Sequence, residues 1–218
     1  MEATTLNTSA TVRTILSLVL SLAIAVMVLI SWSNMVYART DNGVLSASSF
    51  QSLRYFTVLS NLLMAVAAII YLVYGLTHFG KPFPTWLVTL KWAGTVSVLM
   101  TFLTVVLFLG PMFGFQTMFK GANLYFHLIV PLLALFEFIL IDPLPKPEFR
   151  LSFLAALPLV IYGLFYLGAI LLYGIEGHDF YGFCTWGLPV GIVIFLGLIL
   201  ITWGSALLVR LLKIPGKL

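Results

Sequence analysis

Long uncharged apolar runs are the feature that most restricts how this chain can fold. Residues 14 to 38 carry no charge, and comparable runs recur along the rest of the 218 residues. About 20 consecutive apolar residues cross the hydrocarbon core of a bilayer, so each run is long enough for one transmembrane helix. Only 8% of the residues are charged and 61% are hydrophobic, whereas a soluble globular domain carries roughly a quarter charged residues. The sequence therefore predicts an all-α polytopic membrane protein.

Segments with proline, glycine and charge separate the runs and set the expected boundaries. Gly80-Lys81-Pro82 and Gly110-Pro111 are expected to end the second and third spans, because both residue types interrupt helices. The proline-rich segment 142–147 is expected to be a short, stiff connector. We predict a single domain, a bundle of six transmembrane helices joined by short loops. The spans are expected at about 14–36, 54–76, 85–109, 123–141, 151–173 and 186–212.

The distribution of Lys and Arg predicts the orientation of these spans. The side that holds both termini carries Arg13, Lys81, Lys91, Lys146, Arg150, Arg210, Lys213 and Lys217, and the opposite side carries Arg39, Arg54 and Lys120. Basic residues accumulate in cytoplasmic loops, so both termini are expected in the cytoplasm. The cell membrane is the expected location, with the endoplasmic reticulum open as an alternative because it obeys the same charge rule. Loop residues of this kind account for the net charge of +4 and give no reason to expect a nucleic-acid partner.

Two polar stripes stand out against the apolar background. Arg54, Thr57 and Asn61 are spaced three and four apart, so on a helix they share one face. Asn123 and His127 are four apart at the start of the fourth span. In lipid such side chains face protein or a wet cavity. The second and fourth spans run in the same direction, which places Thr57 and His127 at a similar depth, roughly 5 Å from the non-cytoplasmic end of each helix. We expect the two stretches to meet.

The residue types in these stretches suit acyl chemistry. A threonine hydroxyl becomes a nucleophile when a base takes its proton, and histidine serves as that base near neutral pH. Thr57 and His127 are therefore the candidate nucleophile and base. Arg54, Asn61 and Asn123 are candidates to bind the substrate or to stabilise an oxyanion. A shallow site facing the bilayer would take membrane lipids, and a lipid ester fits best. No cofactor is implied.

Structural explanations compete with this one at each position. The Thr57 hydroxyl is expected to bond to the Leu53 carbonyl if it is not catalytic. His127, Asn61 and Asn123 would then hold helices together. Arg54 would extend to lipid headgroups.

Two further charged residues lie near the cytoplasmic ends of their spans. Lys91 is close enough to the interface to extend its amine to water. Glu137 lies too far along its helix to orient His127, and it is expected to pair with Lys91 or with a basic loop residue.

Other classes of function stay open. A carrier would use His127 as a proton relay, and a lipid-binding scaffold would use the polar stripes for packing alone. A metal site on His78, His127 and His178 is disfavoured because His78 falls on the opposite side of the membrane. A site built from His127 with the loop residues Glu176, His178 and Asp179 would suit zinc. The loop residues are expected to be solvated charge, so no metal is predicted.

The two stretches also resemble a known family. The residues that carry the resemblance are the segment RYFT at 54–57 with Asn61, and Asn123-x-x-x-His127 with Glu137. They resemble the androgen-induced and androgen-dependent TFPI-regulating membrane proteins, and the prokaryotic six-span relatives of that group more closely. The resemblance implies a six-helix intramembrane threonine hydrolase that cleaves fatty acid esters of hydroxy fatty acids, with Thr57 as nucleophile and His127 as base. It also implies acyl transfer as a related activity.

Overall fold

The computed structural model describes residues 8–37 and 49–215, and within these ranges the regular structure is entirely helical. Six helical segments are long and apolar enough to cross a membrane: 9–37, 56–77, 85–113, 122–141, 149–173 and 188–212. A segment of 22 residues such as Phe56–Thr77 rises about 33 Å, which matches the thickness of the hydrocarbon core. The chain is thus an all-α polytopic membrane bundle. The turn predicted at 41–43 lies outside the described residues.

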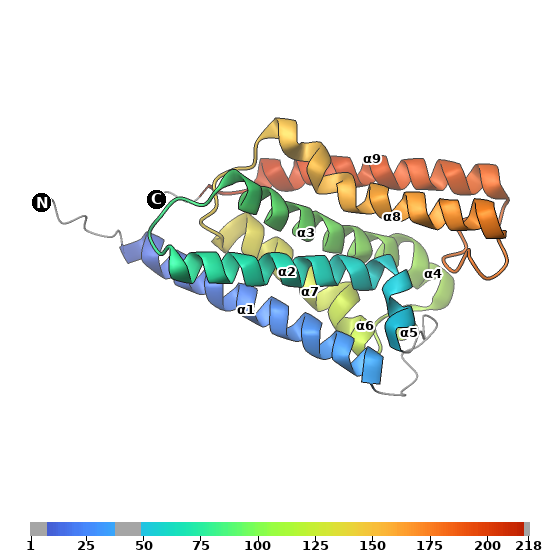
Figure 1. The fold of residues 1–218 in the computed structure, drawn as a ribbon, viewed down its shortest axis with the longest axis horizontal. Helices are drawn as coiled ribbons and strands as arrows, with labels where there is room; N and C mark the ends of the chain where they lie inside the picture. Colours follow the sequence, from blue (N-terminus) through green and yellow to red (C-terminus); the bar gives the residue numbers. More distant parts are fainter. Residues whose placement is uncertain (1–7, 38–48, 216–218) are drawn as a thin grey trace, which may run out of the picture.

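Helix α3 (Thr85–Thr104) lies at the centre of the bundle. It packs against α2 (Phe56–Thr77), α7 (Val130–Phe136), α8 (Ser152–Tyr173) and α9 (Leu188–Leu212). Helix α1 (Thr8–Tyr37) packs along α2, and α8 packs along α9 (Figure 1). The start of α1 and the end of α9 lie at the same end of the bundle (Figure 1). Which side of the membrane that end faces stays a prediction.

Two spans continue past a proline because a wider helical turn precedes it. The sequence predicted that the third span ends at Gly110-Pro111, and this prediction is wrong. Helix α3 passes into the π-helical segment η2 (Val105–Leu109) and then into α4 (Gly110–Phe113). A π-helical turn shifts the hydrogen-bond register, so the chain tolerates the missing N–H and the ring of proline at that point. The span ends at Gly114, whose φ of 89° only glycine adopts easily.

The fourth span is built in the same way. It begins with α6 (Ala122–Leu124), passes through the π-helical segment η3 (Tyr125–Ile129) and reaches Pro131 within α7. A third π-helical segment, η4 (Glu137–Ile141), ends it. Such segments recur at functional sites because they re-aim side chains, and here η3 carries His127 and η4 begins at Glu137.

The remaining boundaries differ from prediction by a few residues. Helix α1 begins at Thr8 rather than at residue 14, and α9 begins at Leu188 rather than at 186. Arg54 does not belong to α2, because it ends the 3-10 helix η1 (Ser49–Arg54). The predicted stripe of Arg54, Thr57 and Asn61 on one helical face is therefore wrong for Arg54. The connector after η4 has no helix up to the 3-10 turn η5 (Phe149–Leu151), as its prolines predicted.

Candidate functional site

Thr57 lies in the first turn of α2, where it is buried. Other helical threonines hide their hydroxyls by donating to the carbonyl four residues earlier. Thr14, Thr77, Thr89, Thr95 and Thr202 all do so, at 2.6 to 2.9 Å. The Thr57 hydroxyl forms no hydrogen bond within residues 8–37 and 49–215, and the bond to Leu53 that would make it purely structural is missing from that part of the chain. Its hydroxyl is therefore available to a ligand.

Asn61 joins the second and fourth spans at this level. Its Nδ2 donates to the Thr57 carbonyl at 2.7 Å and to the Phe126 carbonyl at 3.2 Å. The two polar stretches therefore meet, one residue from His127. Both donors of the Asn61 amide are occupied, so it offers none to an oxyanion in this state. Its Oδ1 is buried and has no hydrogen-bond partner among the described residues.

His127 is fully buried on η3, and one ring nitrogen fixes its orientation. Nδ1 lies 2.6 Å from the carbonyl oxygen of Met118 on α5 (Phe115–Met118). A carbonyl can only accept, so Nδ1 carries the proton and Nε2 keeps its lone pair. This Nε2 is buried and finds no hydrogen-bond partner in the described part of the chain. A neutral imidazole with a free, buried Nε2 has the form that a general base requires.

No hydrogen bond joins the Thr57 hydroxyl to His127 in this structure. Their assignment as nucleophile and base stays a prediction. The structure brings the two residues to one helix crossing, where they are linked through Asn61 and the backbone of Phe126.

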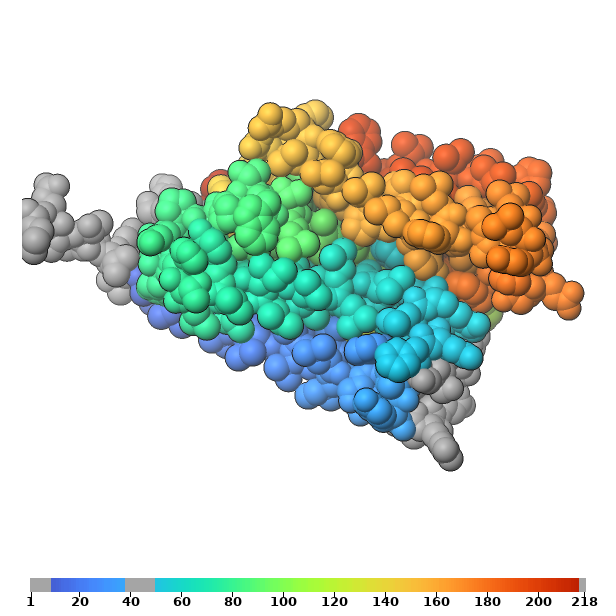
Figure 2. All heavy atoms as spheres, viewed as in Figure 1, coloured from blue at the N-terminus to red at the C-terminus, as the bar shows by residue number. Residues whose placement is uncertain are grey.

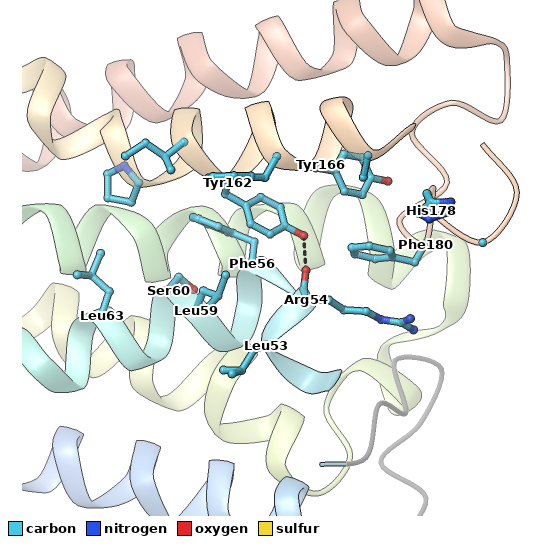
Figure 3. Close-up of a pocket in the computed structure, with 15 residues that line it drawn as sticks. Leu53, Arg54, Phe56, Leu59, Ser60, Leu63, Tyr162, Tyr166, His178 and Phe180 are labelled. Carbon is cyan, nitrogen blue, oxygen red and sulfur yellow. Dashed lines mark hydrogen bonds between the residues drawn. The ribbon is translucent and has the colours of Figure 1, made fainter. Parts of the chain in front are cut away.

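A groove of about 690 Å³ opens beside Thr57, between α2 and α8. Figure 2 shows α2 and α8 together on one face of the molecule. The lining is mostly apolar and aromatic, and Figure 3 shows Phe56, Leu59 and Leu63 of α2 opposite Tyr162 and Tyr166 of α8. The Tyr162 hydroxyl donates to the Arg54 carbonyl at 2.8 Å across one end (Figure 3).

Arg54 and His178 line the same end of the groove. The Arg54 guanidinium is exposed, donates to the Tyr55 hydroxyl at 2.7 Å and lies 5.2 Å from the centre of the Phe180 ring. The described residues provide no acidic partner for it. The groove thus combines an apolar floor with an unpaired cation at its end.

A second, smaller cavity lies deeper and includes Thr57 in its wall. Its volume is about 40 Å³, enough for a water molecule or two. Phe56, Tyr162 and Tyr166 line both this cavity and the groove, so they form the partition between the two spaces. His127 lines neither space.

Two aromatic residues of this region had no signal in the sequence. Tyr166 lies one turn after Tyr162 on α8 and donates to Asp179, and Tyr181 lies in the loop before α9. Asp179 also accepts from the amides of Phe183 and Cys184 at 3.0 and 2.7 Å. It therefore holds its own loop together and is not the solvated charge that the sequence predicted. In the described residues, no group of three or more His, Cys, Asp or Glu could hold a metal ion.

Asn123, the remaining predicted site residue, begins the fourth span. It is buried in α6, one turn before His127, at the end of the bundle that also carries the start of α2. It lines neither the groove nor the smaller cavity.

A charged cluster occupies the other end of the bundle. Lys91 Nζ lies 2.6 Å from Glu137 Oε1 and 2.8 Å from Asp142 Oδ2, and all three side chains are fully buried. The Ser17 and Ser21 hydroxyls donate to Glu137 Oε1 at 2.9 and 2.6 Å. The predicted pair of Glu137 with Lys91 is confirmed. The prediction that Lys91 extends to water is wrong, because two carboxylates hold its amine inside the bundle.

Lys213 closes the charged cluster from the end of α9. Its Nζ donates to the Asp142 carbonyl at 2.7 Å. Burial lowers the pKa of Lys213 to about 8, because removing an ammonium from water disfavours its charged form.

No family model, curated protein or solved structure matches this chain. The resemblance to the androgen-induced membrane proteins therefore depends on the short motifs of the second and fourth spans.

Proposed function

We propose that this protein is an intramembrane hydrolase of lipid esters, with Thr57 as the nucleophile and His127 as the general base. The observation that supports this most is a gathering of polar atoms without partners. Asn61 Oδ1 and His127 Nε2 are buried without partners among the described residues, and the Thr57 hydroxyl, which donates to no described residue, lies at the same crossing of α2 and η3. Buried polar groups are normally satisfied, because leaving one unpaired costs about 1–3 kcal/mol. We infer that the protein retains these unpaired groups because they bind a ligand or take part in a reaction.

The groove between α2 and α8 suits a lipid substrate. Its mostly apolar lining fits an acyl chain, and its end carries the Arg54 guanidinium, which has no acidic partner among the described residues, beside His178. A lipid that diffuses within the membrane would enter sideways between the two helices. Movement of Phe56 or Tyr162 in the partition would bring its ester to Thr57.

The reaction would follow the two steps of acyl-enzyme chemistry. The Thr57 oxygen attacks the ester carbon while His127 takes its proton, and the alcohol leaves with that proton. The small cavity beside Thr57 holds room for the water that then releases the acid. The His127–Thr57 contact would close in the substrate complex, since catalytic hydrogen bonds are often loose without substrate. An alcohol in place of water would give acyl transfer.

The first experiment measures turnover of the purified protein in lipid nanodiscs. We expect release of free acid from fatty acid esters of hydroxy fatty acids, the first class to try, or from another lipid ester in a panel. Thr57→Ala and His127→Gln should each lose at least about 10³-fold in rate, and Thr57→Ser should keep part of it. Thr202→Ala is the matched control, because Thr202 is also buried but donates to the Leu198 carbonyl.

A fluorophosphonate probe provides the second measurement. Wild type and Thr202→Ala should be labelled on Thr57, and Thr57→Ala should not. Folded wild-type protein that neither reacts with the probe nor cleaves any ester of the panel would show that the proposal is wrong. Proton-coupled uptake into liposomes that requires His127 would then identify a carrier.

A further inference from the structure

Tyr181 lies in the loop between α8 and α9, and this loop folds back onto the start of α2. Its hydroxyl oxygen accepts a hydrogen bond at 2.9 Å from the backbone N–H of Phe56, the first residue of that helix. The N–H groups of a first helical turn have no partner within the helix. The Tyr181 hydroxyl therefore lies where the free N–H groups at the start of α2 point, next to Thr57. The residue is 5% exposed.

The surroundings of Tyr181 hold its ring in place. Its ring stacks on that of Phe183, with centres 5.2 Å apart, and meets Tyr55 edge-on. Asp179 fixes the loop by accepting from the amides of Phe183 and Cys184. A hydroxyl positioned in this way needs no rearrangement before it acts on a ligand.

The Tyr181 hydroxyl also interacts with the hydroxyl of Tyr162. Because Tyr162 gives its own proton to the Arg54 carbonyl, an oxyanion would compete only with the Tyr162 oxygen for the proton of Tyr181. Burial raises the pKa of Tyr181 to about 12, so the phenol is protonated at neutral pH and can donate. Tyr181 and Thr57 line the same small cavity. The Tyr162 hydroxyl in that cavity is different, because it already donates to the Arg54 carbonyl.

We propose that the Tyr181 hydroxyl stabilises the oxyanion that forms when Thr57 attacks an ester carbonyl. As the new C–O bond forms, the proton of Thr57 passes to the base and the carbonyl π electrons move onto oxygen. That oxygen accepts the Tyr181 O–H. When the carbonyl re-forms, the bond to the alcohol breaks and the alcohol takes the proton from the base. This role depends on the proposed hydrolase function, and it supplies the oxyanion donor that the occupied Asn61 amide does not.

Tyr181→Phe tests this role, because it removes the hydroxyl and keeps the ring that packs in the loop. Oxyanion donors contribute about 10²–10³-fold to kcat. We expect a fall of that size in kcat with little change in KM. Tyr71→Phe is the control, because it removes another buried tyrosine hydroxyl, one that donates to Ser17 and lines neither cavity, and we expect it to change kcat less than tenfold.

Two inhibitors separate catalysis from a structural effect. A trifluoromethyl ketone analogue of the substrate forms a tetrahedral oxyanion on the nucleophile, and an ether analogue does not. Tyr181→Phe should weaken the ketone by the same factor as kcat/KM and leave the ether unchanged. Suppose that the wild type is active. If Tyr181→Phe then weakens both inhibitors equally, or leaves kcat unchanged, only the proposed role of Tyr181 is overturned. An inactive, unlabelled wild type would instead overturn the hydrolase function itself.

Discussion

The two buried polar regions of this protein differ in whether their groups form ion pairs. At the end of the bundle where α1 begins, the charge of Lys91 is paired with two carboxylates and two serine hydroxyls donate to Glu137 Oε1, although Glu137 Oε2 accepts no hydrogen bond from the described residues. At the end where α2 begins, Thr57, Asn61 and His127 each keep an atom without a partner among the described residues.

The difference separates a structural polar cluster from a candidate reactive one. Pairing lets buried charge exist inside a bundle and connects α1, α3 and η4. It leaves little that a substrate could bind. Unpaired groups stabilise the fold less, and they are free to bind or to react.

Removing the cation of the paired region should have the largest effect on stability. Lys91→Met leaves the carboxylates of Glu137 and Asp142 buried without their partner. We expect the free energy of unfolding to fall by about 3–5 kcal/mol, measured by denaturant or thermal unfolding in detergent micelles.

A triple variant checks the reason for that loss. Lys91→Met combined with Glu137→Gln and Asp142→Asn removes all three charges and should regain much of the lost stability. If Lys91→Met is as stable as wild type, the paired cluster does not support the fold and the contrast between the regions fails.

Packing around the cavity of Thr57 should give the next largest effect. A Cβ added at Gly163 would lie 1.5 Å from Cζ of Phe195, and both residues line that cavity. Gly163→Ala should push the Phe195 ring aside and cost about 1–3 kcal/mol. It should also lower turnover through the change in cavity shape. Gly168→Ala on the same helix is the control, because a Cβ there meets open space.

Removing an unpaired group should barely change stability. His127→Leu loses the hydrogen bond to the Met118 carbonyl, and it also removes the buried Nε2, which has no partner among the described residues. These two effects oppose each other, so we expect a change of less than about 1 kcal/mol together with loss of turnover. A strongly destabilised His127→Leu would indicate that the second region is structural like the first.

An exposed ion pair should have the smallest effect. Arg150 and Glu148 pair at the surface, with most of the arginine side chain in solvent. Arg150→Ala should therefore leave the Tm unchanged within error, because water and salt screen such pairs. A clear drop in Tm would mean that this exposed pair contributes to stability much as the buried pairs of Lys91 do, so that exposure does not explain the difference.

The sequence by itself determined the membrane class, the six spans and the residues that stand out in them. Apolar runs of this length have one stable solution in a bilayer, because a helix satisfies all of its backbone groups internally. Local pattern also predicted a basic partner for Glu137, either Lys91 or a loop residue, since buried charges need a partner of opposite sign, and the structure selected Lys91.

Tertiary structure decided which polar atoms are paired and which are free. The continuation of two spans through Pro111 and Pro131 depends on π-helical turns. The Thr57 hydroxyl has no bond to Leu53 and none to any other described residue. Tyr181 reaches the start of α2 from a distant loop, and His127 is oriented by a backbone carbonyl, that of Met118. These contacts join residues far apart in the chain or depend on main-chain atoms that every residue has, so no local pattern of residue types predicts them.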